Sequence, residues 1–238
     1  MAELSKHPVA VISGVGPGLG AALARRFAQG YAVAINARKA DYLRALAGEI
    51  RASGATVLEA PADIGDRAQV EAAFKLIREQ LGAPDVLVHN AGAGRWGNLL
   101  EVSPEDFEAT WRVNAYGAFI AAREVVPGML ARGRGAILFT GATAGVKAGA
   151  KSAAFGPAKF AMRGLAQSMA RDLGPKGIHV AWINVDGVIA IPGRTIARLK
   201  PEDLLDPAAI AETYWHLAHQ DRSAWTMELE VRPFKEKF

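Results

Sequence analysis

The segment Ser13–Gly20, which reads Ser-Gly-Val-Gly-Pro-Gly-Leu-Gly, constrains the fold more than any other part of the chain. An apolar run, Val9–Ile12, precedes it. A helical pattern follows it, in which Leu19, Leu23 and Phe27 recur four residues apart. Glycine lets a backbone turn tightly, and the free N–H groups at the start of a helix attract an anion. A tight turn without a ligand is the alternative, but alternating glycines between a strand and a helix favour a phosphate-binding turn.

Strand-like and helix-like patterns alternate along the rest of the chain. Strands are predicted at residues 32–36, 56–60, 86–88, 136–140, 177–183 and 225–231. Ser103 and Pro104 are typical of a helix start, and this helix is predicted to reach about Arg132 with a kink near Pro127. The alternation predicts an α/β fold with a doubly wound, mostly parallel sheet, helices on both faces and a ligand site at the carboxyl ends of the strands. The 238 residues, 50% of them hydrophobic, are predicted to form a single domain over 1–238.

Composition narrows the possible chemistry. The chain has no Cys, which excludes disulfides, thiolate metal ligands and a cysteine nucleophile. The net charge is +4, but Lys and Arg are scattered, so we expect no nucleic-acid function. No signal-peptide core and no apolar run of about eighteen residues is present, so we expect a cytoplasmic protein that does not act at a membrane. Glu212, His216 and His219 share one helix face, but an exposed amphipathic helix explains them better than a metal site, and no metal is expected.

The end of the second predicted strand bears on which nucleotide binds. About twenty residues beyond the glycines, an acidic residue would hold the ribose 2′-hydroxyl of NAD(H). The chain has Arg38 and Lys39 there instead. Two basic side chains can neutralise the 2′-phosphate of NADP(H), or they can simply precede an exposed helix. We therefore expect NADP(H), with NAD(H) as the alternative. Asp63, beyond the third strand, is placed either to meet the adenine amino group or to serve as a turn residue.

The turn after the fourth predicted strand, His89-Asn90-Ala91-Gly92, makes a family resemblance specific. The chain resembles the short-chain dehydrogenases/reductases. Its glycine segment matches their Thr-Gly-x-x-x-Gly-x-Gly with Ser13 for Thr, and this turn matches their Asn-Asn-Ala-Gly with His89 for the first Asn. We expect His89 to be a hydrogen-bonded structural residue, with a catalytic role as the alternative. The resemblance implies a Rossmann-like, doubly wound, seven-stranded sheet of order 3-2-1-4-5-6-7, and a homodimer or homotetramer.

Cofactor contacts follow from the same resemblance. The segment Asn184–Ile189 is similar to the family's Asn-x-x-Pro-Gly turn, with Asp186 in place of Pro, which implies that the backbone of Ile189 meets the nicotinamide carboxamide. A small substrate lid is implied at about 190–207. The implied cofactor-binding residues are Ser13, Gly14, Gly16, Gly18, Leu19, Gly20, Arg38, Lys39, Asp63, Asn90, Ala91, Gly92, Lys159, Gly187 and Ile189.

The catalytic positions depart from the family pattern. Asn114 and Lys159 take the positions of the family's catalytic Asn and Lys. The position of the active-site Tyr is Phe155, and the Ser position, thirteen residues earlier, is Ala142. Neither residue can donate a proton; losing a general acid costs about 10²–10⁴ in rate, and losing an oxyanion donor costs about 10²–10³. The chain is therefore most similar to an atypical branch with Phe in place of Tyr, and the usual mechanism cannot operate unchanged.

Nearby residues are candidates to replace the missing groups. Ser152, Thr143 and Lys151 carry exchangeable protons, although each is also typical of a loop or a helix cap. Arg95 and Trp96 follow the fourth strand and would face the lid. The candidate substrate contacts are Arg95, Trp96, Thr143, Ser152 and Phe155.

Two functions fit these residues. One is an NAD(P)(H)-dependent oxidoreductase that acts on a small carbonyl, alcohol or activated alkene. The other is a catalytically silent NADP(H)-binding protein that serves as a sensor or an oligomer partner. Lys159 fits both, because in the family it binds the nicotinamide ribose and also tunes the active-site Tyr.

Overall fold

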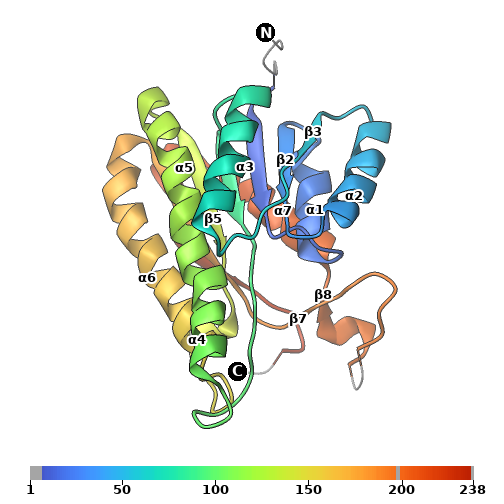
Figure 1. Ribbon diagram of the computed structural model, residues 1–238, viewed down its shortest axis with the longest axis vertical. Coiled ribbons are helices and arrows are strands. Elements are labelled where there is room, and N and C mark those ends of the chain that lie inside the picture. Colours follow the sequence, from blue (N-terminus) through green and yellow to red (C-terminus); the bar gives the residue numbers. More distant parts are fainter. Residues whose placement is uncertain (1–6, 197–198, 237–238) are drawn as a thin grey trace.

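The computed structural model of the protein describes residues 7–196 and 199–236. Its central sheet consists of β1 Val9–Ser13, β2 Ala32–Asn36, β3 Val57–Glu59, β4 Val86–His89, β5 Gly135–Thr140, β6 Ile178–Val185 and β9 Glu228–Val231. The order across the sheet is β3-β2-β1-β4-β5-β6-β9, and each neighbouring pair is parallel (Figure 1). This Rossmann-like arrangement confirms the predicted fold, since β9 is the predicted seventh strand.

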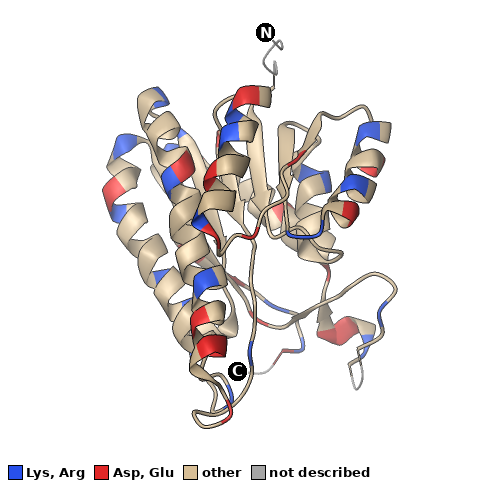
Figure 2. Cartoon of the chain, viewed as in Figure 1, with Lys and Arg blue, Asp and Glu red and all other residues tan. Residues whose placement is uncertain are grey.

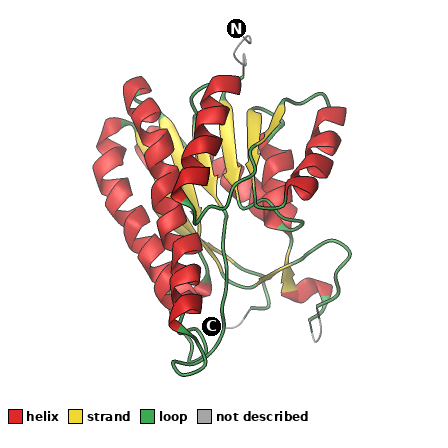
Figure 3. Ribbon diagram, viewed as in Figure 1, coloured by secondary structure: helices red, strands yellow, loops and turns green. Residues whose placement is uncertain are grey.

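Helices cover both faces of the sheet (Figure 3). They are α1 Leu19–Phe27, α2 Ala40–Ala52, α3 Arg67–Gln80, α4 Pro104–Trp111, α5 Gly117–Arg132, α6 Phe155–Leu173 and α7 Pro207–Ala218. One core lies between the sheet and α3, α5 and α6, and includes Phe74, Phe139 and Trp182. The second core lies between the sheet and α1, α2 and α7, and includes Phe27 and Tyr214. The strands are buried between these two layers, as a parallel sheet requires.

The helix predicted from Ser103 to Arg132 is correct at its start but is interrupted. The Ser103 hydroxyl accepts a hydrogen bond of 3.1 Å from the Asp106 backbone, which caps α4. A π-helical turn, Arg112–Tyr116, then separates α4 from α5, and α5 continues through Pro127. The irregularity arises at Asn114, whose side-chain amide donates to the Thr110 carbonyl at 2.8 Å and so takes the acceptor that its backbone would use in an α-helix.

Beyond β6 the chain forms a small second sheet in which β7 Val188–Ile189 pairs in parallel with β8 Leu204–Leu205. Residues 190–196 and 199–203 lie between these strands in the chain, in the region predicted as a lid at about 190–207. Residues 197 and 198 of that region lie outside the described residues.

Charged residues of both signs are interspersed over the helices and loops (Figure 2). Of the two lysines near the carboxyl end, Lys235 forms an ion pair with Glu202 at 3.2 Å. In the part of the chain that the structure describes, no helix has the length and apolar character needed to cross a bilayer.

Candidate functional site

The glycines from the end of β1 into the start of α1 fall into two classes. Gly14 has a positive φ of 85°, and a Cβ atom there would lie 2.3 Å from the Cα atom of Ala91. A Cβ atom on Gly20 would lie 2.5 Å from the Gly14 carbonyl oxygen. Close packing is by itself enough to require glycine at these two positions. A Cβ atom on Gly16, in contrast, would meet nothing within 4 Å, and one on Gly18 would have 3.6 Å to its nearest neighbour, at Ala190. The backbone at Gly16 therefore borders open space that internal packing does not explain.

This open space lies at the start of α1. Gly18 is the N-cap residue and supplies no capping side chain, so the Leu19 and Gly20 N–H groups have no side-chain acceptor there, whereas the Ala21 N–H donates to the Gly16 carbonyl at 2.9 Å. The turn is fixed from below, because the backbone N–H groups of Gly14 and Val15 both donate to the Asn36 carbonyl, at 2.9 and 3.0 Å. A rigid turn, open backbone and a helix N-terminus together fit a pyrophosphate group.

The turn after β4 is joined to the glycine turn by Asn90. Its amide nitrogen donates to the Gly14 carbonyl at 2.9 Å, and its amide oxygen accepts from the Thr140 hydroxyl at 3.1 Å. The Thr140 hydroxyl accepts in turn from the buried Tyr214 hydroxyl at 2.8 Å. These hydrogen bonds of Asn90 fix the two turns relative to each other.

Ser13, at the end of β1, is fully buried, and its hydroxyl has no hydrogen-bond partner within the described part of the chain.

The basic pair beyond β2 lies at the surface. The Arg38 guanidinium is 3.9 Å from the Asp63 carboxylate, and the two side chains are 75% and 37% exposed. Asp63 also accepts a hydrogen bond of 2.9 Å from the Gly65 backbone, so its carboxylate holds a turn as well as facing Arg38. Lys39 is exposed and directly precedes α2. An anion that reached Arg38 would compete only with a long, solvated ion pair.

Asn114 and Lys159 converge beside Gly92. A Cβ atom on Gly92 would lie 3.4 Å from the Asn114 amide oxygen and 3.6 Å from the Lys159 ammonium. Lys159 is buried, and its ammonium donates to the Thr140 carbonyl at 2.8 Å. The Asn114 amide nitrogen donates to the Ala93 carbonyl at 2.7 Å, whereas its oxygen has no partner among the described residues. Burial lowers the pKa of Lys159 to about 8. A buried cation near its titration point thus lies beside a free amide oxygen.

Phe155 begins α6 one turn before Lys159. Its ring centroid lies 5.5 Å from the Lys159 ammonium nitrogen and 5.0 Å from the ring of Trp96, which is 64% exposed. Ala142 precedes the short 3-10 turn Thr143–Gly145 and brings no polar side chain. The side chain one helical turn before Lys159 is therefore an aromatic ring that has no proton to donate.

The hydroxyls considered as replacements already have partners. The Ser152 hydroxyl donates to the Gly149 carbonyl at 2.7 Å and so holds the loop before α6. The Thr143 hydroxyl forms a short hydrogen bond with the Asp186 carboxylate. Lys151 is exposed, and its backbone carbonyl accepts from Gly97 at 2.8 Å. The structure brings these residues near the start of α6 but orients neither hydroxyl as a free donor.

The sequence reasoning missed the surroundings of Asp186. This carboxylate is only 5% exposed and binds both the Thr143 hydroxyl and the Arg232 guanidinium. Arg232 also lies 3.0 Å from the Glu230 carboxylate. The sequence feature that could have indicated this network is Asp186 itself, an acidic residue at the position where the family pattern has Pro. A buried carboxylate needs a cation nearby. The network ties the segment after β6 to β9.

His89, which we expect to be a structural residue, is fully buried at the end of β4. Neither ring nitrogen has a hydrogen bond of normal geometry in the described residues, but a weaker hydrogen bond with the Val113 backbone acts to raise its pKa. Burial, with a smaller effect from the Lys159 charge, lowers the pKa of His89 to about 3. His89 is therefore a neutral ring that packs beside Phe139, with ring centroids 6.2 Å apart.

The remaining predicted contacts differ in burial: Arg95 is exposed, whereas Gly187 and Ile189 are partly buried. Arg95 forms an ion pair of 2.8 Å with Asp106, so its guanidinium already has a carboxylate partner. Gly187 has a φ of 144°, and a Cβ atom there would lie 2.8 Å from the ring of Pro233, so this glycine is required by packing. Ile189 lies in β7, with its side chain close to Gly18. On α7, Glu212 forms an ion pair with Arg26 at 2.5 Å.

A sequence profile described as short chain dehydrogenase matches residues 8–191. The chain belongs to the short-chain dehydrogenase family. A short-chain dehydrogenase/reductase named eriH, from Hericium erinaceus, is 36% identical over 195 residues, which cover 79% of this chain and 77% of the relative. The crystal structure of a short-chain dehydrogenase from Rhodopseudomonas palustris has a TM-score of 0.85 and 35% identity, and covers 97% of this chain and 100% of that one. The alcohol dehydrogenase of Thermococcus sibiricus, complexed with 5-hydroxy-NADP, has a TM-score of 0.87 and 28% identity over 97% and 98%.

Proposed function

We propose that this short-chain dehydrogenase is an NADP(H)-dependent oxidoreductase that acts on a small carbonyl, alcohol or activated alkene. The observation that carries the proposal is the open backbone at Gly16, at the start of α1, linked through the contact of Gly14 with Ala91 to the buried pair Asn114 and Lys159. A pyrophosphate fits the first feature, and the ribose and the reacting atoms fit the second.

The preference for NADP(H) rests on Arg38 and Lys39. Both are exposed cations beyond β2, and the long ion pair of Arg38 with Asp63 leaves the guanidinium free to meet a 2′-phosphate. The NADP analogue held by the relative from Thermococcus sibiricus supports the same choice. The backbone of Ile189, beside Gly18, would meet the nicotinamide end.

Chemistry at this site needs a proton source other than residue 155. When bound, the nicotinamide supplies or accepts the hydride. The proton that the substrate oxygen or carbon requires comes, in our proposal, from the Lys159 ammonium, directly or through a water held by the free Asn114 oxygen. A pKa of about 8 lets this lysine give up a proton near neutral pH and regain it from solvent. Trp96 and Phe155 would present aromatic surface to the substrate.

The second candidate function is NADP(H) binding without turnover. The hydroxyls of Ser152 and Thr143 are both engaged elsewhere, and Phe155 and Ala142 have none to offer. For either function we propose a homodimer or homotetramer. Half-exposed aromatic side chains on α4, α5 and α6 support such an assembly: Phe107, Trp111, Phe119 and Phe160.

Titration of the purified protein with NADPH and NADH, followed by reduced-nicotinamide fluorescence, tests the proposal. We expect Arg38→Gln to weaken NADPH binding about tenfold and to leave NADH binding unchanged. Arg44→Gln is the matched control, because Arg44 is also an exposed arginine near the start of α2 and pairs with Asp41. If neither nucleotide binds, both candidate functions are wrong. If NADPH binds and a screen of carbonyls and activated alkenes finds no oxidation of NADPH, the second function holds.

A further inference from the structure

An open cavity of about 750 Å³ lies at the amino ends of the central strands, whereas the glycine turn lies at their carboxyl ends. Its lining includes Val9, Val86 and Gly135, which are the first residues of β1, β4 and β5. The glycine turn and Asn90 follow the last residues of β1 and β4. The cavity is therefore separate from the proposed nucleotide site and is not needed for the proposed function.

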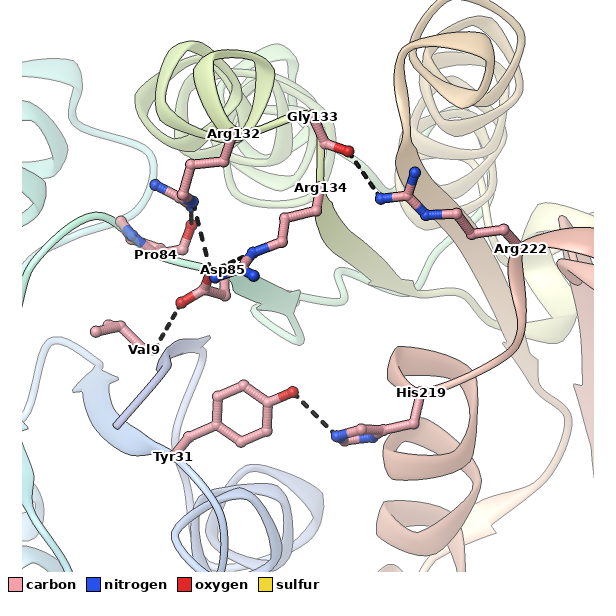
Figure 4. A network of polar contacts seen from close by, with 9 residues as sticks. All are labelled: Val9, Tyr31, Pro84, Asp85, Arg132, Gly133, Arg134, His219 and Arg222. Carbon is pink, nitrogen blue, oxygen red and sulfur yellow. Dashed lines mark hydrogen bonds and ion pairs between the residues drawn. The ribbon is translucent and has the colours of Figure 1, made fainter. Parts of the chain in front are cut away.

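Positive charge gathers on one wall of this cavity. Arg132, Arg134 and Arg222 line it, and Asp85 is the single carboxylate in the described lining. One oxygen of Asp85 lies 3.5 Å from Nε of Arg132 and 3.8 Å from Nε of Arg134, while the other accepts from the Val9 backbone at 3.0 Å (Figure 4). One carboxylate shared in this way cannot neutralise three guanidinium groups, so the wall carries an excess of positive charge.

Backbone carbonyls position two of these arginines without neutralising them. Arg132 donates to the Pro84 carbonyl at 2.6 Å, and Arg222 donates to the Gly133 carbonyl at 2.8 Å (Figure 4). Each guanidinium has several N–H donors, so a single carbonyl leaves donors available. The Arg134 side chain is 68% exposed, and its ion pair with Asp85 is long at 3.8 Å, so it can turn toward a ligand at little cost.

Aromatic side chains line the same cavity. Tyr31 is one of them, and its hydroxyl lies 3.1 Å from a ring nitrogen of His219 (Figure 4). Trp225 is another, and it stacks on His179, with ring centroids 5.0 Å apart and planes 5° apart. Arginines and aromatic rings around one cavity suit a ligand with an acidic group and a planar apolar body.

We infer that this cavity binds a small planar organic acid. Its carboxylate or phosphate meets Arg134 and Arg222, and its planar body lies against Tyr31 and Trp225. A carboxylate and a phosphate can each accept two hydrogen bonds from one guanidinium. The cavity therefore favours a negatively charged, planar ligand without distinguishing a carboxylate from a phosphate.

The test is calorimetric titration of the full chain with phthalate and with phenyl phosphate at low ionic strength, in the presence of saturating NADPH. Benzamide, which has the ring but no charge, and inorganic phosphate, which has the charge but no ring, are the matched probes. We expect phthalate or phenyl phosphate to bind at least tenfold more tightly than either matched probe. The acid that binds more tightly identifies which acidic group the cavity takes.

Variants distinguish this cavity from the nucleotide site. Arg134 is exposed, and replacing it leaves the contacts of Arg132 and Arg222 with backbone carbonyls intact. We expect Arg134→Gln to weaken acid binding about tenfold. Arg67→Gln is the control, since Arg67 is an exposed arginine that pairs with Glu71 on α3. Failure of both acids to bind at millimolar concentration overturns the inference, as does equal binding by Arg134→Gln and by the parent chain. Loss of acid binding on Arg38→Gln would place the acid at the nucleotide site and would also overturn it.

Discussion

The Lys159 ammonium nitrogen lies 5.5 Å from the ring centroid of Phe155, with Lys159 one helical turn further along α6. The family resemblance implies a Tyr hydroxyl on this side of the lysine. Because Phe155 has no such group, the proposed oxidoreductase has a cation at hand but no phenol for the cation to activate. The chemistry of the site therefore turns on this pair.

Restoring the missing hydroxyls tests whether the scaffold supports the usual mechanism. We expect the double variant Phe155→Tyr, Ala142→Ser to reduce generic ketones about 10²–10⁴ times faster than the parent chain, measured as NADPH oxidation. Adding Lys159→Met to the double variant should remove the gain. If the parent already turns over a substrate and Phe155→Tyr slows it, Phe155 is suited to a different reaction.

The buried Lys159 predicts a pH dependence near pH 8. Its ammonium is charged below its pKa of about 8 and neutral above it. We expect NADPH binding and NADPH-dependent reduction to fall as the pH rises through 8 to 9, since the neutral amine is a poorer proton donor to the substrate and a poorer hydrogen-bond donor to the ribose. Lys159→Arg keeps the charge and should bind NADPH without this pH dependence. A parent chain whose NADPH affinity is flat from pH 7 to pH 9 would contradict the prediction.

His89 predicts a loss of stability in mild acid. Its pKa is about 3 in the folded state, well below the ordinary value of 6.5, so below pH 6.5 the unfolded chain binds a proton that the folded chain does not. Stability therefore decreases as the pH falls from 6.5 toward 3. Urea unfolding should show that the parent loses about 1.6 kcal/mol more than His89→Asn between pH 6.5 and pH 5. His216→Asn, at an exposed histidine, is the control and should lose as much as the parent.

The glycine turn allows packing and ligand contact to be separated. A Cβ atom on Gly16 meets nothing within 4 Å, so Gly16→Ala should change the free energy of unfolding by less than about 0.5 kcal/mol while weakening NADPH binding. Gly14→Ala places a Cβ atom 2.3 Å from Ala91 at a φ of 85° and should destabilise the fold by about 3 kcal/mol or more. Thermal unfolding together with NADPH titration checks both. Unchanged NADPH affinity in Gly16→Ala would argue against a pyrophosphate in this turn.

The periodicity of apolar residues was sufficient to predict the sheet and most helices. The elements that it did not predict depend on contacts between residues far apart in the sequence or are too short to show a period. The π-helical turn depends on the Asn114 amide, which reaches the Ala93 carbonyl 21 residues away. The two-residue strands β7 and β8 are too short to carry a pattern.

The candidate site was predictable only in outline. Motifs identified the glycines, Asn114 and Lys159, yet the division of the glycines into packing and open positions depends on Ala91, on another turn. The cavity at the amino ends of the strands could not be predicted, because two of its lining residues, Arg134 and Arg222, are far apart in the sequence. The order of the strands brings them to the same cavity.

The contact between Gly14 and Ala91 also bears on the entropy of binding. With backbone against backbone and Asn90 bridging the two turns, neither turn can rearrange while the other stays in place. The conformational freedom of this region is therefore lost when the chain folds, and not when a nucleotide arrives. An affinity lost on substitution at Gly16 would then measure the contact with the phosphates themselves, free of any cost of ordering the turn.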